Sequence, residues 1–128
     1  MSHDPRFKKL CSEAKSRVDE ISAPDAAAAR SQGAQLIDVR EALDFEKEHA
    51  VGAVHLSKGV IEMKIEQYVP NPATAIICYC GGGNRSALVA DNLLKMGYED
   101  VRSLAGGFKA WTEAGLPMTP SRFQYQCL

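Results

Sequence analysis

The segment that most constrains the fold is residues 73–80, ATAIICYC, a continuous apolar run rich in β-branched side chains. Two prolines lie in the turn before it, at 69–72, and three glycines follow it. A run of this kind is typical of a strand buried on both faces, as in parallel sheets. Residues 86–96 then carry an apolar stripe at helical spacing and end at Gly97, which predicts a helix with a glycine C-cap.

The rest of the chain repeats this alternation of strand and helix signals. The first helix is amphipathic, and a second begins at Ser22, a predicted N-cap, and ends before Gly33. Alternation with helices of about ten residues predicts an α/β fold with a central, mostly parallel sheet and helices on both faces. The remaining predicted elements are helices at 6–20, 41–49, 58–68 and 108–114 and strands at 34–39, 53–56 and 100–104.

Composition limits the function classes before any motif is considered. With 128 residues, 45% hydrophobic and 24% charged, the chain can build one core without disulfide staples. A net charge of −1 attracts neither nucleic acid nor an anionic membrane, and no segment approaches the length of a membrane span. We therefore expect a cytoplasmic protein whose four cysteines are reduced thiols.

The loop after the central strand, residues 80–86 (CGGGNRS), has the chemistry of an anion-binding turn. Glycines accept positive φ and let successive N–H groups point inward, and the next helix adds the unpaired N–H groups of its first turn. A thiol at this position is shifted toward the thiolate, the reactive form. Arg85 adds a fixed positive charge, so the loop suits an anion, a nucleophilic Cys80, or both in turn.

Other interpretations of Cys80 start from the same residues. It could be a metal ligand, a redox partner of Cys78 or a small buried side chain. The glycines only partly match a dinucleotide-binding fingerprint, and Cys78 and Cys80 are too close to pair as metal ligands, with His49 and His55 on other elements. We expect no metal and no cofactor. Cys78 is expected in the core and His3 in solvent. His49 and His55 are expected to be structural or exposed rather than catalytic.

Four separated motifs, taken together, resemble the rhodanese-like domain family of single-domain sulfurtransferases. The resemblance covers residues 20–117 and lies in LIDVR at 36–40, in Phe45 with HAVGAVHL at 49–56, in the loop at 80–86, and in LAGGF at 104–108 with Trp111. It implies a five-stranded sheet and divides the chain into an N-terminal helical extension (1–19), the rhodanese-like domain (20–117) and a C-terminal tail (118–128).

The resemblance also implies a mechanism and a set of site residues. Cys80 would take a sulfur from thiosulfate or another persulfide donor and pass it to cyanide or a thiol, small or on a protein partner. Asp38 and Arg40 would support the fold beside the site, and Trp111 would belong to the core. The cradle of the donor and of the persulfide would be Gly81, Gly82, Gly83, Asn84, Arg85 and Ser86.

Two other functions share this thiolate and arginine. Phosphatases and arsenate reductases resembling the family use the same logic, but tyrosine phosphatases keep five residues between cysteine and arginine, and this chain has four, Gly81 to Asn84. The tighter ring favours one sulfur atom over a phosphoryl group. A non-catalytic sulfur carrier is the third candidate. Gly81, where many thiosulfate-using members have a basic residue, leaves the donor open.

Overall fold

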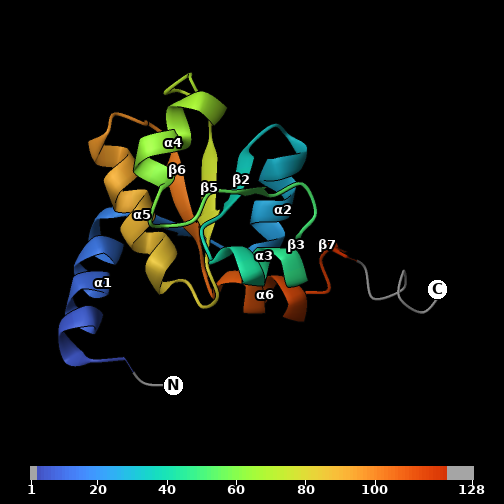
Figure 1. Ribbon diagram of the computed structural model, residues 1–128, viewed down its shortest axis with the longest axis horizontal. Helices are drawn as coiled ribbons and strands as arrows, with labels where there is room; N and C mark the ends of the chain where they lie inside the picture. Colours follow the sequence, from blue (N-terminus) through green and yellow to red (C-terminus); the bar gives the residue numbers. More distant parts are fainter. Residues whose placement is uncertain (1–2, 121–128) are drawn as a thin grey trace.

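The computed structural model describes residues 3–120 and shows strands and helices in alternation (Figure 1). The helices are α1 (Pro5–Arg17), α2 (Ala23–Ser31), α3 (Ala42–Lys47), α4 (Ile61–Tyr68), α5 (Asn84–Lys95) and α6 (Gly107–Glu113). The strands are β1 (Asp19–Ile21), β2 (Gln35–Asp38), β3 (His49–Ala50), β4 (Val54–His55), β5 (Ile76–Tyr79), β6 (Val101–Leu104) and β7 (Met118–Thr119).

The main sheet has five strands in the order β1-β6-β5-β2-β4, and every neighbouring pair is parallel. β5 is central and fully buried, as its apolar run predicted. Its register places Tyr79 opposite Asp38 of β2 and Cys78 opposite Ser103 of β6. The predicted α/β fold with a five-stranded parallel sheet is confirmed, and the functional loop leaves the middle of the sheet at its carboxyl edge.

Helices cover both faces of this sheet, α4 and α5 on one and α2 and α6 on the other (Figure 1). Alternate residues of β5 enter the two cores: Ile76 and Cys78 face α5, whereas Ile77 and Tyr79 face α6. This alternation follows from the two-residue period of a strand. Cys80 continues it on the α5 side.

The N-terminal helix α1 is present and packs along α5 (Figure 1). It ends at Arg17, earlier than the predicted residue 20, because the next residues pair with β6 as β1. Ile21 is buried there, and Ser22 caps α2 as predicted, its Oγ accepting a hydrogen bond from the Asp25 N–H at 3.3 Å. The helical spacing of apolar residues did not reveal this strand, because strands as short as β1 form only when tertiary pairing stabilises them.

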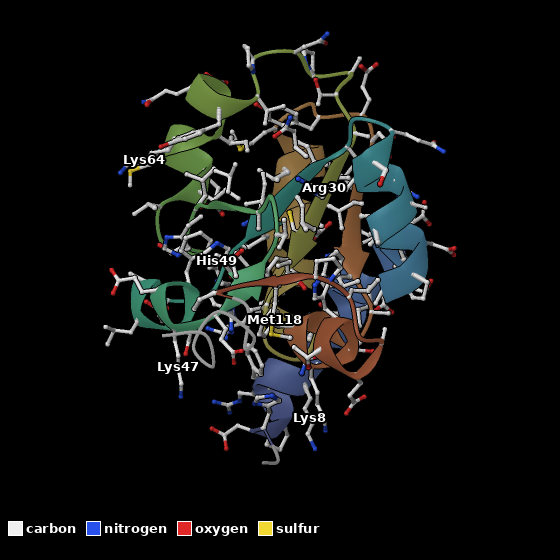
Figure 2. All side chains as sticks on the ribbon, turned by 90° about the vertical axis from the view of Figure 1, so that its right-hand side faces the viewer. Lys8, Arg30, Lys47, His49, Lys64 and Met118 are labelled. Carbon is white, nitrogen blue, oxygen red and sulfur yellow. The ribbon has the colours of Figure 1, made fainter. Side chains whose placement is uncertain are left out.

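A second sheet consists of two antiparallel two-residue strands, β3 and β7, which the sequence analysis did not predict. Figure 2 shows His49 and Met118, one from each strand, near each other beside α6. Strands this short carry no periodic signal, so only the fold brings them together. The division into three segments stays a prediction, and residues 121–128 of the predicted tail lie outside the described part of the chain.

No helix within residues 3–120 has both the length and the apolar character needed to cross a membrane.

Candidate active site

The loop that joins β5 to α5 turns sharply at Gly83. Its φ of +102° is a conformation that only glycine adopts at little cost, and it forms the N-cap of α5. A Cβ on this residue would lie 3.2 Å from the Gly106 nitrogen, so the loop also packs closely against the turn before α6. The helix begins at Asn84, two residues earlier than predicted, which places Asn84 and Arg85 in its first turn.

The Cys80 sulfur lies at the centre of this turn. Its residue is 2% exposed, and Sγ accepts a hydrogen bond from the Gly83 N–H at 3.1 Å. The Ser86 hydroxyl lies 3.5 Å from the same sulfur. Burial raises the pKa of the Cys80 thiol, but hydrogen bonds from Ser86, Gly83 and Gly82 outweigh it, so that the pKa lies below its ordinary value. The loop therefore stabilises a buried thiolate.

Ser86 is itself held by a residue that the sequence analysis missed. Ser103 of β6 is fully buried, and its hydroxyl lies 2.8 Å from the Ser86 hydroxyl. The two hydroxyls connect the thiol to the strand beside β5. The sequence did offer one signal for this residue: a serine within a short apolar strand is expected to be buried, and a buried hydroxyl needs a hydrogen-bond partner.

The start of α6 hydrogen-bonds the backbone of the loop that carries Cys80. Phe108 donates its N–H to the Cys80 carbonyl at 2.8 Å, and Lys109 donates to the Gly81 carbonyl at 3.3 Å. Gly107 permits this approach, because a Cβ there would lie 2.5 Å from the Cys80 carbonyl oxygen. The LAGGF motif thus positions the active-site backbone, a role that no sequence pattern assigned to it.

Asp38 and Arg40 form a buried pair at the end of β2. The Arg40 guanidinium donates to both carboxylate oxygens of Asp38 at 2.8–3.1 Å and also to the Glu48 carbonyl at 2.6 Å. Burial lowers the pKa of Arg40, but the hydrogen bonds and charge of Asp38 outweigh it and raise that pKa overall. The Arg40 guanidinium carbon lies 4.4 Å from the centroid of the Phe108 ring, which connects the pair to the residue that holds the Cys80 carbonyl.

The two internal histidines lie around Phe45. His49 stacks on this ring at 3.7 Å between centroids and His55 at 4.9 Å. One ring nitrogen of each histidine hydrogen-bonds a backbone carbonyl. His49 Nδ1 lies 2.7 Å from the Phe45 carbonyl oxygen, and His55 Nε2 lies 2.7 Å from the Arg40 carbonyl oxygen. Both residues therefore have structural roles, as the sequence predicted.

A cavity of about 380 Å³ opens beside Cys80. Four predicted site residues line it, namely Cys80, Gly82, Asn84 and Arg85. Gly81, Gly83 and Ser86 instead shape the loop behind it through the contacts above. The rest of the lining comes from Phe7 of α1 and from His3 and Asp4, which precede this helix, and no sequence signal connected these three residues with the site. His3 is exposed, as expected, but it also borders this cavity.

The other described cysteines lack the environment of Cys80. Cys78 is fully buried in the core, and burial raises its pKa to about 12, which keeps it protonated and inert. Cys11 is a free, buried thiol on α1, and burial raises its pKa as well. Among residues 3–120, no group of three or more His, Cys, Asp and Glu side chains is placed to hold a metal ion.

Comparison with solved structures gives the same fold. A protein of unknown function from Rhodopseudomonas palustris, described as a possible tyrosine phosphatase, matches with a TM-score of 0.78 and 29% identity. The match covers 91% of this chain and 96% of that one.

Curated relatives include two thiosulfate sulfurtransferases GlpE. The Vibrio cholerae protein is 35% identical, and the match covers 69% of this chain and 81% of that protein. The Pseudomonas savastanoi protein is 37% identical, and the match covers 71% of this chain and 84% of that protein. The family model of the rhodanese-like domain matches residues 22–114, which include the whole loop and both supporting motifs. The chain therefore belongs to the rhodanese-like domain family.

Proposed function

We propose that this protein is a sulfurtransferase that moves a sulfane sulfur from thiosulfate, or another persulfide donor, to cyanide or a thiol through a persulfide on Cys80. The observation that carries the proposal is the Cys80 sulfur, which accepts the Gly83 N–H at 3.1 Å beside a cavity that Arg85 lines. The sulfurtransferase class is supported by the family and by the curated relatives of that name.

In the loading step the Cys80 thiolate attacks the outer sulfur of thiosulfate. A bond forms between Sγ and that sulfur, the sulfur–sulfur bond of the donor breaks, and sulfite leaves with the electron pair. Both sides of this reaction carry three negative charges. We expect Arg85, which lines the cavity, to bind the anionic donor and the departing sulfite, because its guanidinium is permanently charged and carries several N–H donors.

The Cys80 persulfide then needs stabilisation until an acceptor arrives. We expect the backbone N–H groups of Gly82, Gly83 and Ser86 to supply it, since they already donate to the Cys80 sulfur. A cytoplasmic setting, which we also propose, would keep the attacking thiol reduced. The acceptor attacks the outer sulfur and Cys80 returns to the thiolate, so the two half-reactions predict ping-pong kinetics.

The loop length argues against phosphoryl transfer as the main activity. Only four residues separate Cys80 from Arg85, and the Gly83 N–H already contacts the sulfur directly. An additional sulfur atom fits this ring better than a tetrahedral phosphoryl group does. Phosphatase activity, arsenate reduction and a non-catalytic carrier role are the alternatives that the experiment below distinguishes from sulfur transfer.

Intact-mass spectrometry after incubation with thiosulfate, followed by cyanide, tests the proposal. We expect the wild-type protein to gain the mass of one sulfur atom and to lose it to cyanide. Cys80→Ser should gain nothing and remain folded. Cys78→Ala is the matched control and should load normally, because Cys78 is buried within β5 and its raised pKa keeps it protonated.

Sulfur gain by Cys80→Ser would overturn the assignment. Turnover of an aryl phosphate or of arsenate that depends on Cys80, without sulfur loading, would replace it with the phosphatase or reductase function. A loaded protein with a stable persulfide and negligible turnover by cyanide and small thiols would identify a non-catalytic sulfur carrier instead.

A further inference from the structure

The N-terminal helix α1 forms one wall of the cavity that holds Cys80. Phe7 in its first turn and the two preceding residues, His3 and Asp4, line the cavity together with Asn84 and Arg85. Both views place the start of α1 at the same end of the molecule as α6, with Lys8 labelled in Figure 2. This helix precedes the residues that the family model matches, 22–114, so the wall is an addition to the domain.

Two contacts from α1 hold this wall in position. Lys15 donates from Nζ to the Asn84 side-chain oxygen at 2.9 Å, which ties the helix directly to the active-site loop. Arg17 forms a two-pronged pair with Asp91 of α5, at 2.7 and 3.0 Å. Cys11 and Ala14 of the same helix are buried. The second half of α1 is therefore anchored to α5 and the loop, and this anchoring sets where the start of the helix lies beside the cavity.

The cavity is larger than the simplest substrates require. About 380 Å³ lies within the range of pockets that hold small organic ligands, whereas thiosulfate has five atoms and cyanide two. The extra space is bordered by the Phe7 ring, which packs edge-on to His3 at 4.9 Å between centroids. This aromatic surface suits the carbon chain of an organic molecule.

The charges that border the cavity have opposite signs. Arg85 and Asp4 are both among the residues that line it. Asp4 precedes α1 as its N-cap, yet within the described residues its side chain caps no N–H group of that helix. A carboxylate here repels thiosulfate, sulfite and cyanide, so Asp4 serves neither the donor nor the simplest acceptor. It attracts a cation instead.

We propose that His3, Asp4 and Phe7 form an acceptor subsite and that the preferred acceptor is a small organic thiol carrying an ammonium group. This inference rests on the proposed sulfur transfer through Cys80. The carbon chain lies along Phe7, the ammonium group pairs with Asp4, and the sulfur faces the Cys80 persulfide. The apolar and acidic wall thus selects the acceptor, while Arg85 binds the donor.

The transfer step balances without any further reactant. The acceptor thiolate attacks the outer sulfur of the Cys80 persulfide, and a new sulfur–sulfur bond forms on the acceptor. The bond between that outer sulfur and Sγ breaks, and its electron pair returns to Cys80 as the thiolate. One thiolate and one persulfide anion are present before and after the step.

The test compares three thiols of similar size on protein preloaded with thiosulfate: cysteamine, 2-mercaptoethanol and 3-mercaptopropionate. Single-turnover unloading is followed by intact mass at equal thiolate concentrations. The wild-type protein should prefer cysteamine. Asp4→Asn should slow unloading by cysteamine about twofold to fivefold, as for an exposed ion pair, and leave 2-mercaptoethanol unchanged. Unloading by 3-mercaptopropionate should become faster because a repulsion is removed.

Glu13→Gln is the matched control. Glu13 is an exposed acid on the same helix, nine residues and roughly 13 Å further along the axis, so its removal should alter none of the three rates. Phe7→Ala should slow cysteamine and 2-mercaptoethanol alike, because both carbon chains lose the aromatic surface. For each thiol, the unloading rate of the variant is divided by that of the wild-type protein, which removes the intrinsic reactivity of the thiol from the comparison.

The outcomes separate this inference from the proposed function. Absence of sulfur loading in the wild-type protein would reject the function itself. Normal loading with an Asp4→Asn effect that is zero, or equal for all three thiols, would overturn the subsite alone. Unloading by a reduced dithiol protein but by none of the small thiols would also overturn it, in favour of a protein acceptor.

Discussion

The α-carbon of Gly107 faces the main chain of Cys80 so closely that a side chain has no room between them. An added Cβ would lie 2.5 Å from the Cys80 carbonyl oxygen and 2.6 Å from that of Gly81. Gly107 also has a φ of +59°, in the left-handed region. Two backbone N–H groups of α6 reach the active-site loop only because of this approach.

We therefore expect Gly107→Ala to displace the loop and impair sulfur loading. The clash is with backbone atoms, which cannot rotate away, and should lower the free energy of unfolding by about 2–4 kcal/mol. Urea denaturation measures the stability, and intact mass after thiosulfate measures loading.

Gly115→Ala is the control for backbone strain alone. Its φ of +70° is similar, but nothing lies within 4 Å of an added Cβ. It should cost about 1 kcal/mol and leave sulfur loading unchanged. Equal loading by both variants would show that the Gly107 contact does not position the loop.

The second prediction concerns the Ser86 hydroxyl. Burial raises the pKa of Cys80, and the hydrogen bonds led by Ser86 lower it below its ordinary value. Ser86→Ala removes one of these donors, so the pKa should rise and the thiolate fraction at neutral pH should fall. The pH profile of Cys80 alkylation, mapped by mass spectrometry, should move to higher pH, and sulfur loading at pH 7 should slow severalfold. An unchanged profile would contradict this role.

Ser103→Ala should produce a smaller shift in the same direction. It leaves the Ser86 hydroxyl in place but removes its partner at 2.8 Å. A Ser103→Ala shift as large as that of Ser86→Ala would mean that Ser103 is needed to orient the donor.

How much of the site the sequence could predict depends on whether its parts are local. The strand before Cys80, the turn at Gly83 and the helix after it are consecutive, so apolar runs and glycines predicted them. Ser103 and Gly107 support this loop from β6 and α6, and Phe7 borders the cavity from α1. Local patterns did not connect these three residues with Cys80, because only the packed fold brings their elements together.

The same reasoning explains the errors at element boundaries. The predicted helix ended at residue 20 and therefore included the first two residues of β1, since Val18 continues the apolar stripe of α1. β3 and β7 have two residues each and are separated by most of the chain. Whether two strands so far apart in the sequence pair depends on the topology of the fold, and the spacing of apolar residues within each strand does not predict it.

The third prediction concerns the buried pair of Asp38 and Arg40. Arg40→Met leaves the fully buried Asp38 carboxylate without its partner, and we expect a loss of about 3 kcal/mol in unfolding free energy. Arg40→Lys should cost less but still destabilise, because an ammonium cannot reproduce the two-pronged geometry or the contact with the Phe108 ring. Urea denaturation measures both.

The double variant Asp38→Asn with Arg40→Met distinguishes an unpaired charge from lost packing. It removes the buried carboxylate charge together with its partner, so it should recover part of the stability that Arg40→Met loses. A double variant less stable than the single one would indicate that packing of the arginine, rather than charge, dominates.

The last prediction is a pH dependence at the contact that fixes α1 to α5. The hydrogen bonds and charge of Arg17 lower the pKa of Asp91 in the folded chain. Folding therefore favours the carboxylate. The pair stabilises the fold above the unfolded pKa, about 3.9, and this contribution disappears as the pH falls through the lower folded value. Asp91→Asn should destabilise the protein at pH 6, and the gap from wild type should narrow toward pH 2.5. Asp19→Asn, an exposed control on β1, should show almost no gap at either pH, and an Asp91→Asn gap that does not change with pH would contradict the ion-pair interpretation.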